Sequence, residues 1–229
     1  MLIREKKRII RLLHADDIEL ILQELMRLPG IQVINPLFAG LCCADEKARW
    51  HAVTGMGAVV ARLAEQDMEA CRVIMRRLMW SLNDESGGIG WGAPEAMGEI
   101  MACHKGLADE YAHILVSYMR EDGNYLEHEV LQRGLLWGVS RLSQVRPELM
   151  HKWRAGRYLL SYLDSGDATS RGLAAWSLGL LRIIKAQKKI QLLVDDPHEL
   201  RFYWDRKLSV PSVGNLAEQA LTRLSQDSH

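Results

Sequence analysis

The chain has 229 residues, of which 48% are hydrophobic and 25% are charged, and 29 Lys and Arg balance 29 Asp and Glu. This composition is typical of a globular protein that folds around its own core. The formal net charge of zero argues against a general nucleic-acid binder, because such domains usually carry a strong positive charge. No apolar run approaches the roughly 18 residues of a membrane span, and the basic N-terminal segment has no signal-peptide core. We therefore expect a cytoplasmic protein that does not bind a membrane.

The cysteines and histidines show no pattern of a cofactor or metal site. The four cysteines form no CxxC pair and lie in apolar, helical surroundings, so we expect reduced thiols that pack as small hydrophobic side chains. The eight histidines do not combine with them in the ligand spacing of a zinc module. Nucleotide-binding and nucleophile-elbow motifs are also missing from the sequence. The sequence thus predicts no cofactor, no metal and no catalytic residue.

The first predicted elements are helices. Asp16 stands three residues before Glu19, the spacing of a capping box, and an apolar stripe follows until Pro29-Gly30. Asn35-Pro36 is typical of the start of another helix. We therefore expect residues 1–34 to form an N-terminal helical cap.

A repeat of about forty residues follows. Glycines recur in one column at steps of 41, 40 and 41 residues, namely Gly57, Gly98, Gly138 and Gly179. Acidic turn residues precede these segments at Asp45, Asp84, Asp122 and Asp164. Each unit therefore reads as a helix, an acidic turn and a second helix. Because glycine inside a helix costs about 1 kcal/mol relative to alanine, its recurrence indicates that neighbouring backbones pass closely there.

The C-terminal part of the chain continues the helices and then departs from them. Pro147 begins a helix expected to run to Leu163, and another is expected from Ala168 to about Ala186. Residues 200–204 and 208–210 have strand composition and predict a small hairpin before a last helix. We expect residues 35–195 to form the repeat array and residues 196–229 to form a hairpin and a capping helix, all in one continuous domain.

Two segments carry a family resemblance. Arg49-x-x-Ala52-x-x-x-x-Gly57 and its counterpart from Arg171 to Gly179 resemble the second helix of HEAT and HEAT-like (armadillo-type) repeats. The middle units depart from this pattern, with Gly90 and Val130 where arginine would stand. The resemblance implies an all-α fold, a right-handed α-solenoid of about four helix pairs, and most members of the superfamily are protein-binding scaffolds. The segment 80–94 is similar to one in small bacterial HEAT-repeat proteins of unassigned function.

The segment from Asn83 to Gly92 is the least regular part of the repeat array. It contains four glycines and two adjacent acids, and tryptophans flank it. Glycine lets a partner approach the backbone, and acids beside indoles suit a cation or a basic side chain. A loop whose glycines merely permit the turn is the structural alternative. The candidate binding residues are Trp80, Asn83, Asp84, Glu85, Ser86, Trp91, Glu95 and Glu99.

The tryptophans allow two interpretations. Trp50 and Trp91 occupy the same repeat phase, and Trp137 and Trp176 fall in nearby phases of later units. Indoles on neighbouring helices would form a stacking groove, whereas helical spacing also suits simple core packing. The helical spacing favours core packing over a groove.

These observations favour a protein–protein interaction scaffold or adaptor that uses the concave face of the array and the 83–92 loop. Its protein partner is not identified, and a homodimer is compatible with the sequence. The alternative is a HEAT-like nucleobase-recognising protein or DNA glycosylase-type enzyme that uses Trp80, Asp84 and downstream arginines. The acids near Trp80 disfavour that alternative, because they would repel a phosphate backbone. The arginines concerned are Arg120, Arg133, Arg141, Arg146, Arg154 and Arg157.

Overall fold

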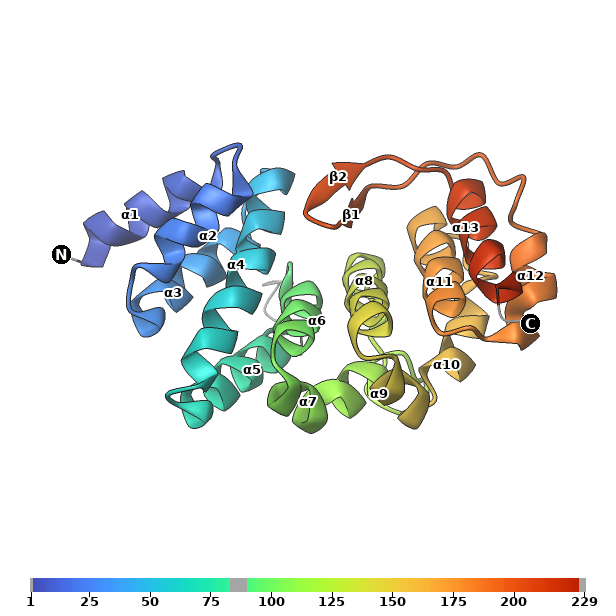
Figure 1. Cartoon of the computed structure of the whole chain (residues 1–229), viewed down its shortest axis with the longest axis horizontal. Coiled ribbons are helices and arrows are strands. Elements are labelled where there is room, and N and C mark those ends of the chain that lie inside the picture. The colour runs from blue at the N-terminus through green and yellow to red at the C-terminus, as the bar shows by residue number, and fades with distance from the viewer. Residues whose placement is uncertain (1, 83–89, 227–229) are drawn as a thin grey trace. The chain divides into compact units, whose positions relative to one another are not determined.

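A computed structural model describes residues 2–82 and 90–226 of the chain, and Figure 1 shows their path. Helices dominate, as the sequence predicts. The chain divides into two compact units, residues 1–108 and 109–229, and each is described here by itself. None of the described helices combines the length and the hydropathy needed to cross a bilayer.

The first unit is built around one long helix, α4. This helix is flanked in sequence and in space by shorter helices, and it packs most extensively against α3 and α6. Buried aliphatic side chains such as Leu37, Met56 and Val59 form the core between these helices. The unit comprises α1 (Leu2–Leu13), α2 (Ile18–Met26), α3 (Gly30–Leu41), α4 (Glu46–Ala64), α5 (Met68–Leu82) and α6 (Ala93–Cys103), and α7 (Lys105–Ser117) crosses into the second unit.

Two predicted helix starts in this unit are wrong. The N-cap of α2 is Asp17, whose carboxylate accepts the backbone N–H groups of Glu19 and Leu20, and not Asp16. Asn35-Pro36 does not begin a helix, because α3 starts at Gly30 and contains Pro36. A proline inside a helix removes one hydrogen bond, but α3 buries aliphatic side chains on both sides of Pro36, which offsets that cost.

The glycine column marks close helix contacts, as predicted, at the two positions where the contact geometry is described. A Cβ at Gly57 would lie 2.6 Å from the Cγ of Glu99, so α4 meets α6 here. A Cβ at Gly179 would lie 2.5 Å from the Cα of Ala220, so α11 meets α13 in the second unit. Real side chains do not tolerate such distances, and glycine is therefore required for these helices to approach.

The second unit holds two further helix pairs and the C-terminal cap. Its elements are α8 (Glu129–Val145), α9 (Pro147–Lys152), α10 (Ala155–Tyr162), α11 (Ala168–Leu180), a 3-10 turn η1 (Ile184–Ala186), α12 (Gln187–Gln191), β1 (Phe202–Trp204), β2 (Lys207–Ser209) and α13 (Val213–Ser225). In this unit α11 is the central helix and packs between α8 and α13 (Figure 1).

Two predicted helices of this unit are shorter than expected. The helix that starts at Pro147 does not run on to Leu163, because Arg154 adopts a left-handed backbone conformation with φ 57° and separates α9 from α10. The helix that starts at Ala168 ends at Leu180 instead of Ala186, and Arg182, with φ 53°, redirects the chain after it. The sequence does not indicate that an arginine will adopt this left-handed conformation. The helical periodicity continues across both positions, so it did not predict either break.

The predicted C-terminal hairpin is confirmed. Antiparallel β1 and β2 pair Phe202 with Ser209 and Trp204 with Lys207, and within the described residues they form the one sheet of the chain. The connecting residues Asp205 and Arg206 have φ values of 47° and 64°. Positive φ at both central positions is the geometry of the two-residue turn that matches the twist of a hairpin.

Candidate functional site

The start of α6 is fixed by a glycine. Gly92 precedes the helix with φ 71°, and a Cβ there would lie 3.1 Å from the carbonyl oxygen of Leu41. Pro94 then stands in the first turn, where a missing N–H costs nothing. This arrangement places Trp91 immediately before α6 and Glu95 in its first turn.

Glu99 lies one turn after Glu95 and faces α4. Its Cγ and backbone carbonyl lie against Gly57, and its carboxylate Oε1 is 3.6 Å from the Sγ of Cys103, which donates a weak hydrogen bond. The side chain is buried, with 8% of the residue exposed. Two carboxylates at i and i+4 share one face of a helix, so α6 presents a pair of acids to α4.

Glu95 is the less satisfied acid of this pair. Its Oε2 is inaccessible to water and has no hydrogen-bond partner within the described residues, although other atoms of the side chain keep contact with solvent. Burial raises the pKa of Glu95 from 4.5 to about 7, and the hydrogen bond from its own backbone N–H and the charge of Arg49 oppose this shift only in part. A carboxylate with unused acceptor capacity is therefore held next to α4. It can receive a proton or a hydrogen-bond donor from a ligand.

This raised pKa predicts that the Glu95→Gln variant is more stable than the wild type at high pH. The native state binds the Glu95 proton more tightly than the unfolded chain, so wild-type stability declines as the pH rises from about 4.5 to about 7. The full pKa shift corresponds to a stability difference of at most about 3 kcal/mol. Because the side chain partly contacts water, we expect Glu95→Gln to be more stable than the wild type by about 1–2 kcal/mol at pH 8. At pH 4, below the ordinary pKa, the two proteins are expected to be equally stable, as measured by urea denaturation.

The exposed residue Glu218 on α13 provides a matched control, because its carboxylate is in water in both states. Glu218→Gln removes a carboxylate from the surface and is expected to leave the midpoint of unfolding unchanged. If the Glu95→Gln variant is likewise indistinguishable from the wild type at pH 8, the Glu95 carboxylate is not held in a desolvated environment.

The remaining candidates of the first unit are only partly described. Trp80 lies near the end of α5 and is 78% exposed, and Trp91 is 40% exposed. A Cβ at Gly90 would lie 2.7 Å from the carbonyl oxygen of Ser81, so the chain returns to the end of α5 before α6 begins. Asn83, Asp84, Glu85 and Ser86 lie outside the described residues. The structure thus brings Glu95 and Glu99 together on one helix face, with Trp91 directly before that helix.

In the second unit the C-terminal hairpin covers the tryptophans. The Nε1 of Trp137 donates a hydrogen bond of 2.6 Å to the backbone carbonyl of Tyr203. Trp176 makes edge-to-face contacts with Phe202 and Trp204, with ring centroids 5.6 and 5.4 Å apart. Both indoles are at least 95% buried. Core packing is therefore the correct interpretation for Trp137 and Trp176, because the chain's own hairpin occupies the surface where a stacking groove would lie.

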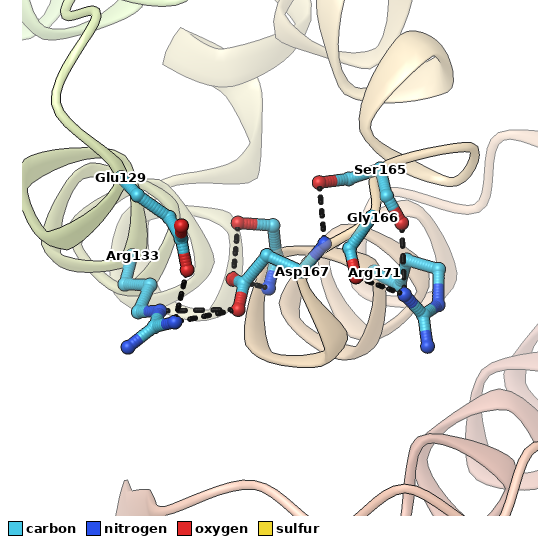
Figure 2. Close-up of polar contacts among 7 residues, drawn as sticks. Glu129, Arg133, Ser165, Gly166, Asp167 and Arg171 are labelled. Carbon is cyan, nitrogen blue, oxygen red and sulfur yellow. Dashed lines mark hydrogen bonds and ion pairs between the residues drawn. The ribbon is translucent and has the colours of Figure 1, made fainter.

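A network of arginines and aspartates connects successive helices of the second unit (Figure 2). Asp167 caps α11 by accepting the backbone N–H of Ser170 at 2.8 Å, and it also accepts hydrogen bonds from Arg133 of α8 at 2.8 and 3.2 Å. Arg171 donates to the carbonyls of Ser165 and Gly166 in the turn before its own helix, and to Asp196 at 2.7 and 3.0 Å. The network fixes the register of adjacent helices, so these charged side chains have a structural role.

The role of Arg133 was missed in the sequence. The glycine column has a small residue five positions before three of its members, and Arg133 is the exception at Gly138. The structure shows that this exception reaches Asp167 of the next helix pair and Glu129 of its own helix. This repeat unit has Val130 where the HEAT-like pattern would have an arginine. Arg133, about one turn later, instead pairs with the following repeat. The N-cap role of Asp167 is predictable from the sequence, because the aspartate stands three residues before Ser170.

The arginines of the nucleobase alternative are largely engaged in structural contacts. Arg120 pairs with Asp122, Arg133 pairs with Asp167, and the guanidinium of Arg157 lies over the ring of Tyr158. The cysteines are free thiols, but Cys42 and Cys103 are exposed and do not pack in the core as expected. No group of three or more metal-ligating side chains occurs among the residues described. Asp84, which that alternative requires, lies outside the described residues, and none of the contacts named above favours the glycosylase-type alternative.

Comparison with known proteins adds the fold class. No protein-family model and no curated protein sequence matches the chain. Among solved structures, a designed armadillo repeat protein matches with a TM-score of 0.52 and 17% identity over 95% of this chain and 98% of that chain. A related design in complex with a (KR)4 peptide matches with a TM-score of 0.54 and 16% identity over the same shares. An engineered protein matches with a TM-score of 0.55 and 14% identity over 96% of each chain.

Proposed function

We propose that this armadillo-like repeat protein is a protein-interaction scaffold whose α4–α6 face binds a basic segment of a partner protein. The fold itself supports a scaffold, since helical repeat arrays bind through surfaces built from successive repeats. The observation that carries the proposal is the acidic pair Glu95 and Glu99 on α6, with the Glu95 Oε2 buried and lacking a hydrogen-bond partner in the described part of the chain.

The chemistry of this face suits a lysine or arginine side chain. A carboxylate that is already desolvated forms a stronger ion pair than one in water, because little hydration has to be removed when the ligand binds. Trp91, which is exposed directly before α6, provides an aromatic surface over which a guanidinium or ammonium group can lie. The peptide in the structure of the designed armadillo protein is also basic, and that similarity motivates the choice of probe.

The test is a titration of the full chain with a fluorescently labelled (KR)4 peptide, followed by anisotropy at pH 8. Two charge-assisted hydrogen bonds, each worth about 1.5–3 kcal/mol, predict that the Glu95→Gln, Glu99→Gln double variant binds at least about tenfold more weakly. Glu218→Gln is the matched control and is expected to bind the peptide as the wild type does. Equal affinity of all three proteins, or no binding of the peptide to the wild type, would refute the proposed site.

The pKa of Glu95 gives this binding a pH dependence with a defined sign. The carboxylate is charged above about pH 7 and neutral below it, so the affinity for a cationic peptide is expected to rise between pH 6 and pH 8. Over the same interval the stability of the free protein is expected to decline. A rise in affinity that persists in the Glu95→Gln variant would assign the pH dependence to another group.

A further inference from the structure

A second surface of the first unit is apolar, and neither Glu95 nor Glu99 is among its lining residues. Helices α3 and α5 enclose a groove with a volume of about 320 Å³, lined by aliphatic side chains from both helices. Ile31 of α3 is 61% exposed and Val73 of α5 is 52% exposed, although both are large hydrophobic residues. Ile34 and Ile74 lie deeper in the groove and are buried.

The exposed side chains follow one stripe of α5. Val73, Arg77 and Trp80 are spaced by four and three residues, which places them on one face of a helix. Trp80 is 78% exposed, so the stripe extends the apolar surface toward the C-terminal end of α5. An apolar surface that combines a hollow with protruding aliphatic and aromatic groups is typical of a site that another polypeptide covers.

The charge around the groove is mostly positive. Residues 30–41 contain no charged residue, and α5 contains one acid, Glu69, and three bases, Arg72, Arg76 and Arg77. Arg72 and Arg76 share the carboxylate of Glu69, at 3.4 and 2.7 Å. Arg77, on the groove wall, contacts neutral groups within the described residues, namely the amide oxygen of Asn35 and the ring of Phe38. The groove is therefore complementary to an acidic ligand.

The groove also favours a helical ligand over an extended one. Its walls are helices whose backbone groups bond within each helix, so they offer no row of donors and acceptors to an extended peptide. An extended chain pressed into this apolar surface would leave its own N–H and C=O groups without partners, which is costly. A helix satisfies its backbone internally and needs only an apolar face of matching width.

We propose that the α3–α5 groove docks an acidic amphipathic helix of a partner protein. The apolar face of that helix covers Ile31 and Val73, and its flanking carboxylates pair with Arg77. Among the described residues Arg77 contacts a neutral amide and a ring, so an incoming carboxylate can replace these contacts without breaking an ion pair that the structure describes. This surface is separate from the acidic α6 face, and a ligand of opposite charge is expected there.

The experiment uses two labelled helical peptides of about 18 residues that share the same leucine stripe. In the acidic peptide the positions outside the leucine stripe are glutamates, and in the basic peptide they are lysines. With the full-length protein we expect the acidic peptide to bind at least about tenfold more tightly than the basic one in anisotropy titrations. Val73→Glu is expected to abolish binding of the acidic peptide, and Arg77→Glu is expected to reverse the preference between the two peptides.

The matched control is Ile184→Glu, which places the same charge at an aliphatic residue of the second unit that is 57% exposed. It should bind the acidic peptide as the wild type does, and circular dichroism should show that all variants fold. Failure of the acidic peptide to bind, equal binding of both peptides, or binding that survives Val73→Glu would overturn the proposal. A concentration-dependent dimer in sedimentation that Val73→Glu dissociates would also overturn it, because a second copy of the chain would then be the occupant.

Discussion

Replacing Gly179 by leucine is expected to lower the free energy of unfolding by about 2 kcal/mol. The Cβ alone would lie 2.5 Å from the backbone Cα of Ala220 and 2.6 Å from its Cβ. No rotamer of the new side chain relieves this clash, because the obstacle is the backbone of α13, and the two helices have to separate. Overpacking of this kind typically costs 1–3 kcal/mol, and a gain of about 1 kcal/mol in helix propensity offsets only part of it.

Urea denaturation followed by circular dichroism measures this effect. Gly166→Ala is the control, because no atom lies within 4 Å of a Cβ built at that glycine. It is expected to be neutral or stabilising by a few tenths of a kcal/mol, since alanine restricts the unfolded chain. An unchanged unfolding midpoint for Gly179→Leu would show that α11 and α13 do not pack through this position.

The second large effect is expected for Asp167→Ala, at about 3 kcal/mol of lost stability. The substitution removes the N-cap of α11, worth about 1 kcal/mol, together with the hydrogen bonds to Arg133 and to the buried hydroxyl of Ser170. A buried group that loses its partner costs about 1–3 kcal/mol in addition. The side chain of Asp167 is only 12% exposed, so water does not replace these contacts.

Asp167→Asn separates the cap from the charge, because the amide oxygen still accepts the N–H of Ser170. We expect it to lose about half as much stability as the alanine variant at pH 7. Burial by itself would raise the pKa of Asp167, but hydrogen bonds from Arg133 and Ser170 outweigh burial and hold the pKa below its ordinary value of 3.8. The stabilisation from the charge is therefore present above about pH 4 and is lost as the pH falls through the lowered pKa.

The matched control for this experiment is Asp122→Ala. The carboxylate of Asp122 also pairs with an arginine, Arg120, but its side chain is 76% exposed. Water and salt screen such pairs, so the midpoint of unfolding is expected to stay unchanged. Equal losses for Asp122→Ala and Asp167→Ala would mean that the network in Figure 2 adds nothing to an ordinary surface ion pair.

The candidate site was predictable only in part. Glu95 and Glu99 share a helix face by their spacing alone, and a proline in the first turn already places Glu95 near the helix start. Their burial was not predictable, because it depends on the approach of α4 through Gly57, which is 42 residues away from Glu99 in the chain. The raised pKa of Glu95 follows from that approach and not from its sequence neighbours.

The apolar groove between α3 and α5 had no sequence signal at all. The apolar stripe of α5 predicts that Ile74 faces the core, and the structure confirms it, but the stripe does not indicate that Val73, which lies outside it, stands beside an exposed aliphatic residue of α3. The wrong start assigned to α3 at Asn35-Pro36 would also have removed Ile31 from that helix. The groove therefore appears only when both helices are correctly bounded and placed together.

The sequence by itself determined the elements that depend on local chemistry. Helical periodicity, the forty-residue glycine column and the strand composition around Asp205-Arg206 identified the helices and the hairpin, because each depends on residues close together in the chain. Tertiary structure decided which interpretation of each long-range feature is correct. It buried Trp137 and Trp176 under the hairpin, and it directed Arg133 to Asp167, 34 residues away. Such pairings depend on the packing of separate helices, and a local pattern carries no information about the partner that packing will supply.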